Sequence, residues 1–312
     1  MNTSIKTGID CLTECHFCSH ECSANRYLDS STGFCRAGTS YAVGSVCLHR
    51  GEEPPISGEY GICNVFYTHC NLQCVYCQNY QISNNNSPTV EEKLSVDELS
   101  ERIIQELLKG AKAVGFVSAS HMIPQTIAVI ENLRSKGYSS VFVYNTNAYD
   151  TVDSLRILEP YIDVYLPDFK YSDDELAFDL SGIRHYKTTA LNAIREMYRQ
   201  KGSVLHCDDD GHALNGIIIR HLVLPGEIEN SLGVLRTIAD EISTSVHLSL
   251  MSQYNPDYCR IDYHQMNRPI SEEEYEQVTD AFNDLGFRKG FIQELSSLAD
   301  FNPDFTENQP FD

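Results

Sequence analysis

The stretch ICNVFYTHCNLQCVYCQNY, from Ile62 to Tyr80, carries more information about the architecture than any other part of this sequence. Its first residues, Ile62 to Thr68, are β-branched, aromatic and apolar, and such a run predicts a strand. Cys70, Cys74 and Cys77 follow directly, with the spacing C-x3-C-x2-C. A strand that leads straight into three thiols predicts a site at its carboxyl end, where α/β proteins commonly place their active groups.

Strands and helices alternate from this stretch onward. Capping boxes at Ser95–Glu98 and Ser271–Glu274 predict helix starts, and Pro124 suits the first turn of another helix. Six strand–helix units fit, fewer than the eight of a closed barrel. The sequence therefore predicts an α/β fold, an open (β/α)6 partial TIM-type barrel over residues 61–300. The predicted strands are 62–68, 114–118, 141–144, 162–166, 217–224 and 246–250, with a further candidate at 291–295.

The rest of the chain is expected to flank this barrel. Residues 1–60 are rich in Cys, Ser and Gly, and they predict a metal-binding, mostly irregular amino-terminal extension that ends in a stiff connector at Pro54 and Pro55. Residues 301–312 predict a polar tail.

Composition excludes several classes of protein. The 312 residues carry a formal net charge of −21, which argues against nucleic-acid binding. No run approaches the roughly 20 apolar residues of a membrane span, and the first ten residues lack the apolar stretch of a signal peptide. We therefore expect a cytoplasmic protein. Ten of the twelve cysteines lie between Cys11 and Cys77, and in the cytoplasm such clusters indicate metal ligands or redox centres.

Three thiolates on one tight loop can hold three irons of a [4Fe–4S] cluster, which leaves the fourth iron open to a substrate or cofactor. Cys70, Cys74 and Cys77 predict such a site, and Tyr76 supplies an aromatic face beside it. The alternative is a structural zinc with His69 as the fourth ligand. Cys11, Cys15 and Cys18 repeat the same spacing, with Phe17 in the equivalent aromatic place, so only the preceding strand separates the two triplets.

A second metal site is predicted in the extension. Cys15, Cys18, Cys22 and Cys35 form C-x2-C-x3-C-x12-C, a pattern that suits structural zinc or a fully ligated iron–sulfur cluster. Spacing does not separate the two metals, and Cys11 could replace one of the four ligands. A second cluster would relay electrons, whereas zinc would only hold the segment together.

Polar clusters follow the predicted strands, and their common position at one end of the barrel makes them candidates for binding a nucleoside cofactor. They comprise Ser118, Ser120 and His121; Asn145, Thr146 and Asn147; Asp168 and Lys170; Arg220 and His221; and Ser252 and Gln253. His121 is the candidate catalytic residue, although a packed imidazole is an equally good interpretation. The acidic loop around Asp210 and Gly211 is interpreted as a turn.

Taken together, the segments CHFCSHEC, EEPPISG, CNLQCVYCQN, YNTNAY, VYLPDFKY, RHLVLPG and SLMSQYNP resemble the radical S-adenosylmethionine (SAM) superfamily. Within it they are similar to uncharacterised homologues of pyruvate formate-lyase activating enzyme, over nearly the whole chain. The resemblance implies that the open iron binds the amino and carboxylate groups of SAM. One electron from the cluster then cleaves the sulfonium to a 5′-deoxyadenosyl radical, which abstracts a hydrogen atom.

The resemblance also suggests contacts for SAM. Asp168 and Lys170 match an Asp-x-Lys pair near the methionyl group, and Thr146 and Asn147 match a Thr-Asn pair. The family's Gly-Gly-Glu motif is replaced by SASH, so Ser118 and Ser120 would have to make the amino-group contact. We add Tyr76, Arg220, His221 and Gln253 as further candidate contacts.

We therefore expect a radical SAM enzyme with an unidentified substrate. The candidate substrates are a glycyl residue of a partner enzyme acting in trans, an unrelated peptide and a small molecule. A one-electron reductant such as flavodoxin or ferredoxin would supply the electrons. The alternative is a non-catalytic iron–sulfur electron carrier or a degenerate SAM-binding protein. Formation of 5′-deoxyadenosine distinguishes the two.

Overall fold

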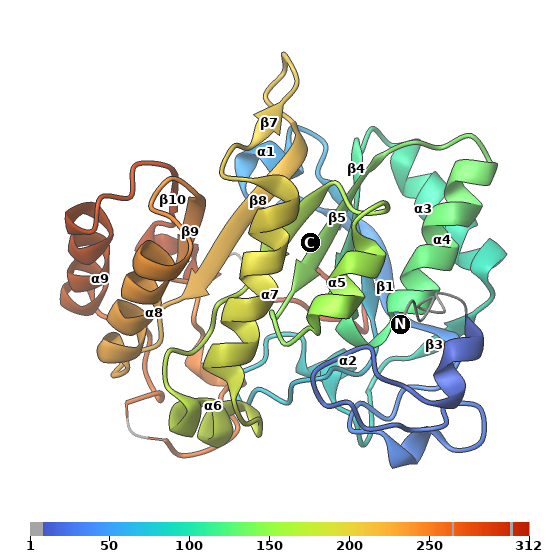
Figure 1. Ribbon diagram of the computed structural model, residues 1–312, viewed down its shortest axis with the longest axis horizontal. Helices are drawn as coiled ribbons and strands as arrows, with labels where there is room; N and C mark the ends of the chain where they lie inside the picture. The colour runs from blue at the N-terminus through green and yellow to red at the C-terminus, as the bar shows by residue number, and fades with distance from the viewer. Residues whose placement is uncertain (1–8, 264, 300–301, 312) are drawn as a thin grey trace, which may run out of the picture.

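The computed structural model describes residues 9–263, 265–299 and 302–311. Residues 1–8 of the expected extension and residues 301 and 312 of the expected tail lie outside the described part. A ten-stranded sheet forms the centre of the described protein, with the strand order β10-β9-β8-β6-β5-β4-β2-β1-β3 and with β7 (His206–Cys207) paired to β8. Figure 1 shows this sheet behind α4, α5, α7 and α8.

The parallel part of the sheet has the architecture expected from the sequence. In the strand order β2-β4-β5-β6-β8-β9, each strand pairs in parallel with the next. These six strands make a (β/α)6 partial barrel. These strands are β2 (Ile62–Tyr67), β4 (Ala113–Val117), β5 (Val141–Thr146), β6 (Val164–Pro167), β8 (Ala213–Leu222) and β9 (His247–Met251). A short strand, β10 (Gly290–Ile292), adds in parallel to β9, so the candidate strand at 291–295 is confirmed in a shorter form.

Helices connect successive strands, as parallel pairing requires. They are α3 (Val96–Leu107), α4 (Ile123–Ser135), α5 (Val152–Leu158), α6 (Asp174–Ser181), α7 (Tyr186–Lys201), α8 (Ile228–Glu241) and α9 (Glu272–Asp284). Both expected capping boxes are present, at Ser95 for α3 and at Ser271 for α9. Pro124 lies in the first turn of α4. Short helices α1 (Pro54–Ser57) and α2 (Tyr80–Ser83) flank β2.

The edge beyond β2 differs from the expectation of an irregular extension. β1 (Tyr41–His49) pairs antiparallel with β2 and with β3 (Glu92–Leu94), so part of residues 1–60 extends the barrel sheet. Sequence analysis missed β1 and α6. The segment YAVGSVCLH has a strand composition, but Gly44 and Ser45 interrupt it at the point where the pairing register shifts.

The extension before β1 packs on the barrel. Residues 9–40 contain two short 3-10 helices and turns, and Figure 1 shows this segment (dark blue) below α4. Its apolar side chains belong to the main core, because Leu12 is fully buried and Phe17 is 6% exposed. The amino-terminal cysteines are therefore held against the barrel.

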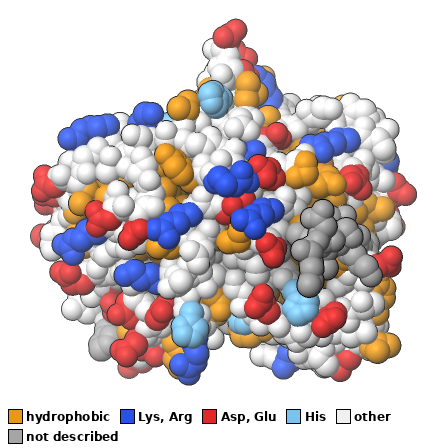
Figure 2. All heavy atoms as spheres, in the orientation of Figure 1, with side chains coloured by type: hydrophobic (Ala, Val, Ile, Leu, Met, Phe, Trp, Pro, Cys, Tyr) orange, Lys and Arg blue, Asp and Glu red, His pale blue; other side chains and the backbone are white. Residues whose placement is uncertain are grey.

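Charged side chains of both signs are interspersed over the face drawn in Figure 2, without a continuous basic stripe. Among the described residues, no helix is long and apolar enough to cross a membrane.

Candidate functional site

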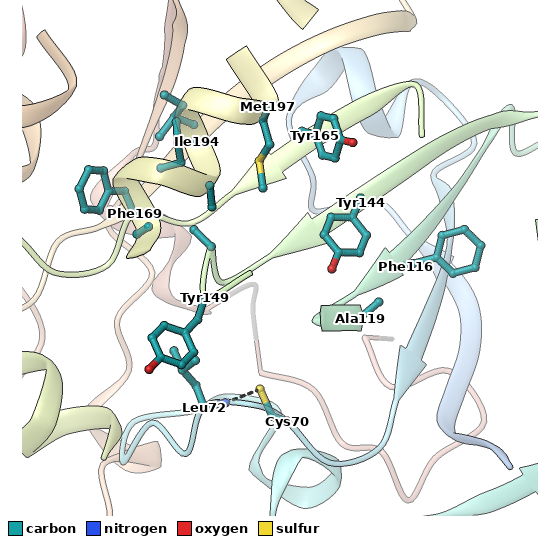
Figure 3. Packing of buried hydrophobic residues seen from close by; sticks show 14 of the residues in the cluster. Cys70, Leu72, Phe116, Ala119, Tyr144, Tyr149, Tyr165, Phe169, Ile194 and Met197 are labelled. Carbon is teal, nitrogen blue, oxygen red and sulfur yellow. Dashed lines mark hydrogen bonds between the residues drawn. The ribbon is translucent and has the colours of Figure 1, made fainter. Parts of the chain in front are cut away.

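The loop after β2 holds three thiols in a fixed arrangement, and we call Cys70, Cys74 and Cys77 the cavity triplet. The Asn85 side chain clamps the start of the loop, because its Oδ1 accepts a hydrogen bond from Cys70 N at 2.9 Å and its Nδ2 donates to Cys70 O at 2.9 Å. Figure 3 shows the Cys70 sulfur beside Leu72, at the edge of the buried core. These bonds fix Cys70; Cys70 and Cys74 are buried, and Cys77 is half-buried.

Hydrogen-bond donors surround the cavity triplet. Each thiol has at least one: Leu72 N to Cys70 Sγ at 3.3 Å, Ser181 Oγ to Cys74 Sγ at 3.0 Å and Ser83 Oγ to Cys77 Sγ at 3.3 Å. Burial raises the pKa of Cys70 to about 12 in the metal-free chain. Donors aimed at sulfur are what a buried thiolate needs, and metal binding deprotonates the thiol.

The donor set fits an iron–sulfur cluster better than zinc. Tetrahedral zinc with bonds of about 2.3 Å holds its sulfur ligands about 3.8 Å apart. Among the described residues, no three cysteine sulfurs lie within 4.8 Å of one another. A cubane spreads its thiolates more widely, since each binds a different iron. His69 does not complete a zinc site with the triplet, because in the described chain no three of these ligand atoms lie within 4.8 Å of one another; its Nε2 lies 3.1 Å from Glu91 Oε2.

A cavity of about 750 Å³ opens in front of the cavity triplet. Its wall comes from the loop after β2 and from the carboxyl ends of β4, β5, β6, β8 and β9. The predicted contacts that line it are Tyr76, Ser118, Asn147, Asp168, Lys170, Arg220 and Gln253. The structure therefore brings most of the predicted polar clusters together with the three thiols.

Asp168 and Lys170 form an ion pair on this wall, with 2.6 Å between Lys170 Nζ and Asp168 Oδ2. Burial disfavours the charged ammonium, but the Asp168 carboxylate outweighs burial and raises the pKa of Lys170 above its usual range. The pair therefore presents one fixed positive and one fixed negative charge to the cavity. Asn147 connects this wall to the triplet, because its Nδ2 lies 3.7 Å from Cys70 Sγ.

Sequence analysis missed two acidic residues of the wall, Glu52 and Glu53. Both pair with Arg220, whose Nε donates to Glu53 Oε1 at 2.9 Å. Burial opposes ionisation of Glu52, yet Arg220 lowers the pKa of Glu52 to about 2. The signal was the segment EEPPISG, since the prolines fix the turn of α1 that aims both carboxylates inward.

Tyr76 connects the cavity to the triplet through hydroxyl groups. Its Oη lies 2.6 Å from Tyr171 Oη, which lies 2.7 Å from Ser181 Oγ, and that hydroxyl donates to Cys74. Gln253, another residue of the cavity wall, is held by a separate hydrogen bond, in which Gln293 Nε2 donates to Gln253 Oε1 at 2.9 Å.

Four predicted site residues lie behind the wall and do not line the cavity. Ser120 bonds Thr146 at 3.2 Å, and Thr146 donates to the buried Asp150 carboxylate. His221 lies between Phe169 O and Ser231 Oγ and is fully buried. These three side chains support the strand ends through hydrogen bonds.

His121 is the fourth residue behind the wall. It is 1% exposed, and its Nε2 lies 2.9 Å from Thr68 O. Burial lowers the pKa of His121 to about 3, so it stays neutral. In this position the imidazole is a packed core group, the second of the two interpretations that the sequence left open.

The second predicted metal site lies beside the first. We call Cys15, Cys18, Cys22 and Cys35 the amino-terminal quartet; three of them are buried and Cys22 is exposed. Cys18 makes a β-bridge with Asp150, just after β5, so the quartet adjoins the barrel end that carries the cavity.

The acidic loop also agrees with its interpretation as a turn. Gly211 N donates to Asp208 O at 3.0 Å, which closes the turn. Asp208, Asp210 and His212 lie within 4.8 Å of one another, but Lys112 Nζ already lies 3.0 Å from Asp210. A lysine therefore supplies the cation there.

Comparisons with known proteins agree with the fold. No family model matches the chain. An uncharacterized protein of Methanocaldococcus jannaschii is 28% identical over 282 residues, which cover 89% of this chain and 77% of that protein. SuiB of Streptococcus suis, bound to the precursor peptide SuiA, has a TM-score of 0.50 and 14% identity, over 74% of this chain and 48% of SuiB. SuiB bound to S-adenosylmethionine has a TM-score of 0.49 and 13% identity, over 74% of this chain and 50% of SuiB.

The chain thus spans about half the length of SuiB. At this identity the likeness concerns the fold, and it agrees with the partial barrel.

Proposed function

We propose that the protein is a radical SAM enzyme that holds a [4Fe–4S] cluster on the cavity triplet, binds SAM in the cavity and removes a hydrogen atom from a substrate there. The observation that carries this proposal is the position of three hydrogen-bonded thiols at one wall of a 750 Å³ cavity lined by polar strand ends. When bound, the cluster and SAM together supply a reductive cleavage that yields the 5′-deoxyadenosyl radical.

The residues of the cavity have distinct tasks in this proposal. The cavity triplet supplies three ligands and leaves one iron for SAM. Asp168 and Lys170 are opposite charges 2.6 Å apart, and they suit the amino and carboxylate groups of a methionyl moiety. Ser118, Asn147 and Gln253 line the same cavity and offer polar groups for the rest of SAM.

The cavity also has to keep water from the reacting atoms. Tyr76 is 7% exposed and Tyr254 is 1% exposed, and both rings line the cavity. Such rings exclude water, and the ion pairs around them fix the orientation of charged ligands. Reaction in the cytoplasm, where clustered thiols stay reduced, suits this chemistry.

A peptidyl hydrogen donor is the substrate class that we propose to test first. SuiB was crystallised with a precursor peptide and with SAM, and a glycyl residue of a partner enzyme belongs to the same class. Flavodoxin or ferredoxin is the proposed reductant.

The test is anaerobic reconstitution with iron and sulfide, reduction with dithionite, and chromatography of 5′-deoxyadenosine after addition of SAM. We expect 5′-deoxyadenosine from the wild-type chain and none from a Cys74→Ala variant. An intact cluster that binds no SAM and produces no 5′-deoxyadenosine would contradict the proposal and favour an electron carrier.

A further inference from the structure

The segment before β1 is folded so that it gathers its cysteines. Cys15 N donates to Ala24 O at 3.0 Å and Ser23 N donates to Cys15 O at 3.1 Å, which closes a tight loop around Cys18 and Cys22. Gly33 brings the next turn close, because a Cβ added there would lie 3.5 Å from Cys22 Sγ. Cys35 follows two residues later, so all four thiols converge.

A buried cation lies beside these thiols. Arg26 is 4% exposed, and its Nη1 lies 4.0 Å from Cys15 Sγ. Its remaining hydrogen bonds go to carbonyl groups, such as Ala37 O at 2.8 Å, and to the Met122 sulfur at 3.5 Å. Within the described part of the chain, Arg26 forms no ion pair with a carboxylate. A buried charge requires a counter-charge, and ligated thiolates of the quartet would supply it.

Sulfur spacing favours an iron–sulfur cluster over zinc. No three cysteine sulfurs of the described chain lie within 4.8 Å of one another, whereas a zinc site needs about 3.8 Å. The cysteines nevertheless belong to one compact loop, because Cys15 and Ala24 form a β-bridge and a Cβ on Gly33 would lie 3.5 Å from Cys22 Sγ. Four sulfurs that are near one another but too far apart for one ion suit a cubane.

Two short connections run from the quartet to the cavity triplet. Asn85 Nδ2 donates to Phe34 O at 3.0 Å, and the same side chain clamps Cys70. Phe34 precedes Cys35, so the bonds along this connection limit the distance between the Cα atoms of Cys35 and Cys70 to at most about 14 Å. On the second connection, His20 Nε2 lies 2.8 Å from Asn71 O, next to Cys70.

We propose that Cys15, Cys18, Cys22 and Cys35 hold a second iron–sulfur cluster, which passes electrons one at a time to the cluster on the cavity triplet. The inference rests on the proposed function for the receiving cluster. Exposure gives the direction, because the quartet has one exposed member, Cys22, whereas Cys70 and Cys74 are buried and Cys77 is half-buried. A one-electron carrier protein gives one electron to the quartet cluster at its exposed side. The quartet cluster then gives that electron to the cavity cluster, and no bond or proton is exchanged.

Metal analysis of the reconstituted chain tests the site. We expect about eight irons and eight sulfides in the wild-type chain, and about four of each in a Cys70→Ala/Cys74→Ala/Cys77→Ala variant. A Cys207→Ala variant, which changes an exposed cysteine outside both sites, should keep about eight irons. One zinc with about four irons in the wild-type chain would overturn the proposal, even if the triple variant does not fold.

Electron paramagnetic resonance tests the coupling. At the short separation above, the spectrum of the doubly reduced wild-type chain should differ from the sum of two single-cluster spectra. The two single-cluster spectra are measured on the Cys70→Ala/Cys74→Ala/Cys77→Ala variant and on a Cys18→Ala/Cys35→Ala variant. A spectrum equal to that sum would overturn the relay.

Neither readout requires SAM. A failed relay would therefore leave the proposed function standing, and an absence of 5′-deoxyadenosine in a chain with both clusters would count against the proposed function alone.

Discussion

Two stretches of this chain have the same cysteine spacing but different surroundings. Cys70, Cys74 and Cys77 follow a buried strand and line a cavity. In the other stretch, Cys11 lies within a 3-10 helix (Ile9–Thr13), and Cys15 and Cys18 follow that helix. The aromatic residues at the equivalent places differ in the same way.

Tyr76 lines the cavity, while Phe17 is buried in the core and its carbonyl accepts a bond from Ser154 Oγ at 2.8 Å. Spacing alone therefore does not identify a cofactor site. The element before the first cysteine does, because a strand of a parallel sheet delivers its loop to the end where the other strands also finish.

The largest expected effect on activity comes from replacing the first cysteine of the cavity stretch by alanine, compared with the same replacement in the other stretch. Cys70→Ala should abolish 5′-deoxyadenosine formation with dithionite, because it removes a ligand of the cavity cluster. Cys11→Ala, the matched position, should retain activity within about twofold, since surface or half-buried changes away from a site have small effects. Equal losses in both variants would show that the two stretches are not functionally distinct.

The two regions also neutralise a buried arginine differently, and this contrast predicts the second effect. Arg220 pairs with two carboxylates, whereas Arg26 Nη1 lies 4.0 Å from Cys15 Sγ and depends on the proposed cluster ligands for a counter-charge. The pKa of Glu52 is about 2 when folded and 4.5 in the reference state, so its ionised form stabilises the fold above pH 4.5, and this stabilisation is lost as the pH falls from 4.5 to 2.

Glu52→Gln should therefore cost about 3 kcal/mol in the free energy of unfolding at pH 7. The difference in the free energy of unfolding between Glu52→Gln and the wild-type chain should be smaller at pH 4 than at pH 7. Urea unfolding at the two pH values measures both quantities, and a difference that does not depend on pH would contradict the pairing with Arg220.

A smaller effect is expected for the ion pair of the cavity wall. Asp168→Asn leaves Lys170 without its carboxylate and should raise the KM for SAM on the order of tenfold, which corresponds to about 1.4 kcal/mol. Lys112→Met removes an exposed ion pair in the acidic loop and serves as the control, with no change in KM expected. An unchanged KM in Asp168→Asn would remove this pair from the SAM site.

The smallest effect on activity is expected for His121, which joins the two regions. Its Nε2 lies 2.9 Å from Thr68 O, near the cavity triplet, and Arg26 of the amino-terminal segment donates to its carbonyl. His121→Asn should cost about 1–3 kcal/mol of stability and leave the rate per folded molecule within about twofold. A large loss of rate without a loss of stability would make His121 catalytic after all.

The sequence predicted the parallel strands, the main helices and the end of the barrel at which the polar residues lie, because hydrophobic periodicity and capping residues are local signals. β1 was missed because Gly44 and Ser45 interrupt its pattern and only pairing with β2 stabilises it. Glu52 and Glu53 were missed because their role depends on Arg220, which is distant in sequence. Ser118 faces the cavity, whereas Ser120 lies behind its wall. The difference depends on the geometry of the turn after β4, which the composition does not specify.

The cavity cluster can be observed by itself in the Cys18→Ala/Cys35→Ala variant. Electron paramagnetic resonance of this variant, reduced and measured with and without SAM, asks directly whether one iron is open. We expect SAM to change the spectrum, because its amino and carboxylate groups bind the iron that no cysteine holds. Identical spectra, or a zinc ion bound by Cys70, Cys74 and Cys77, would contradict the proposed chemistry.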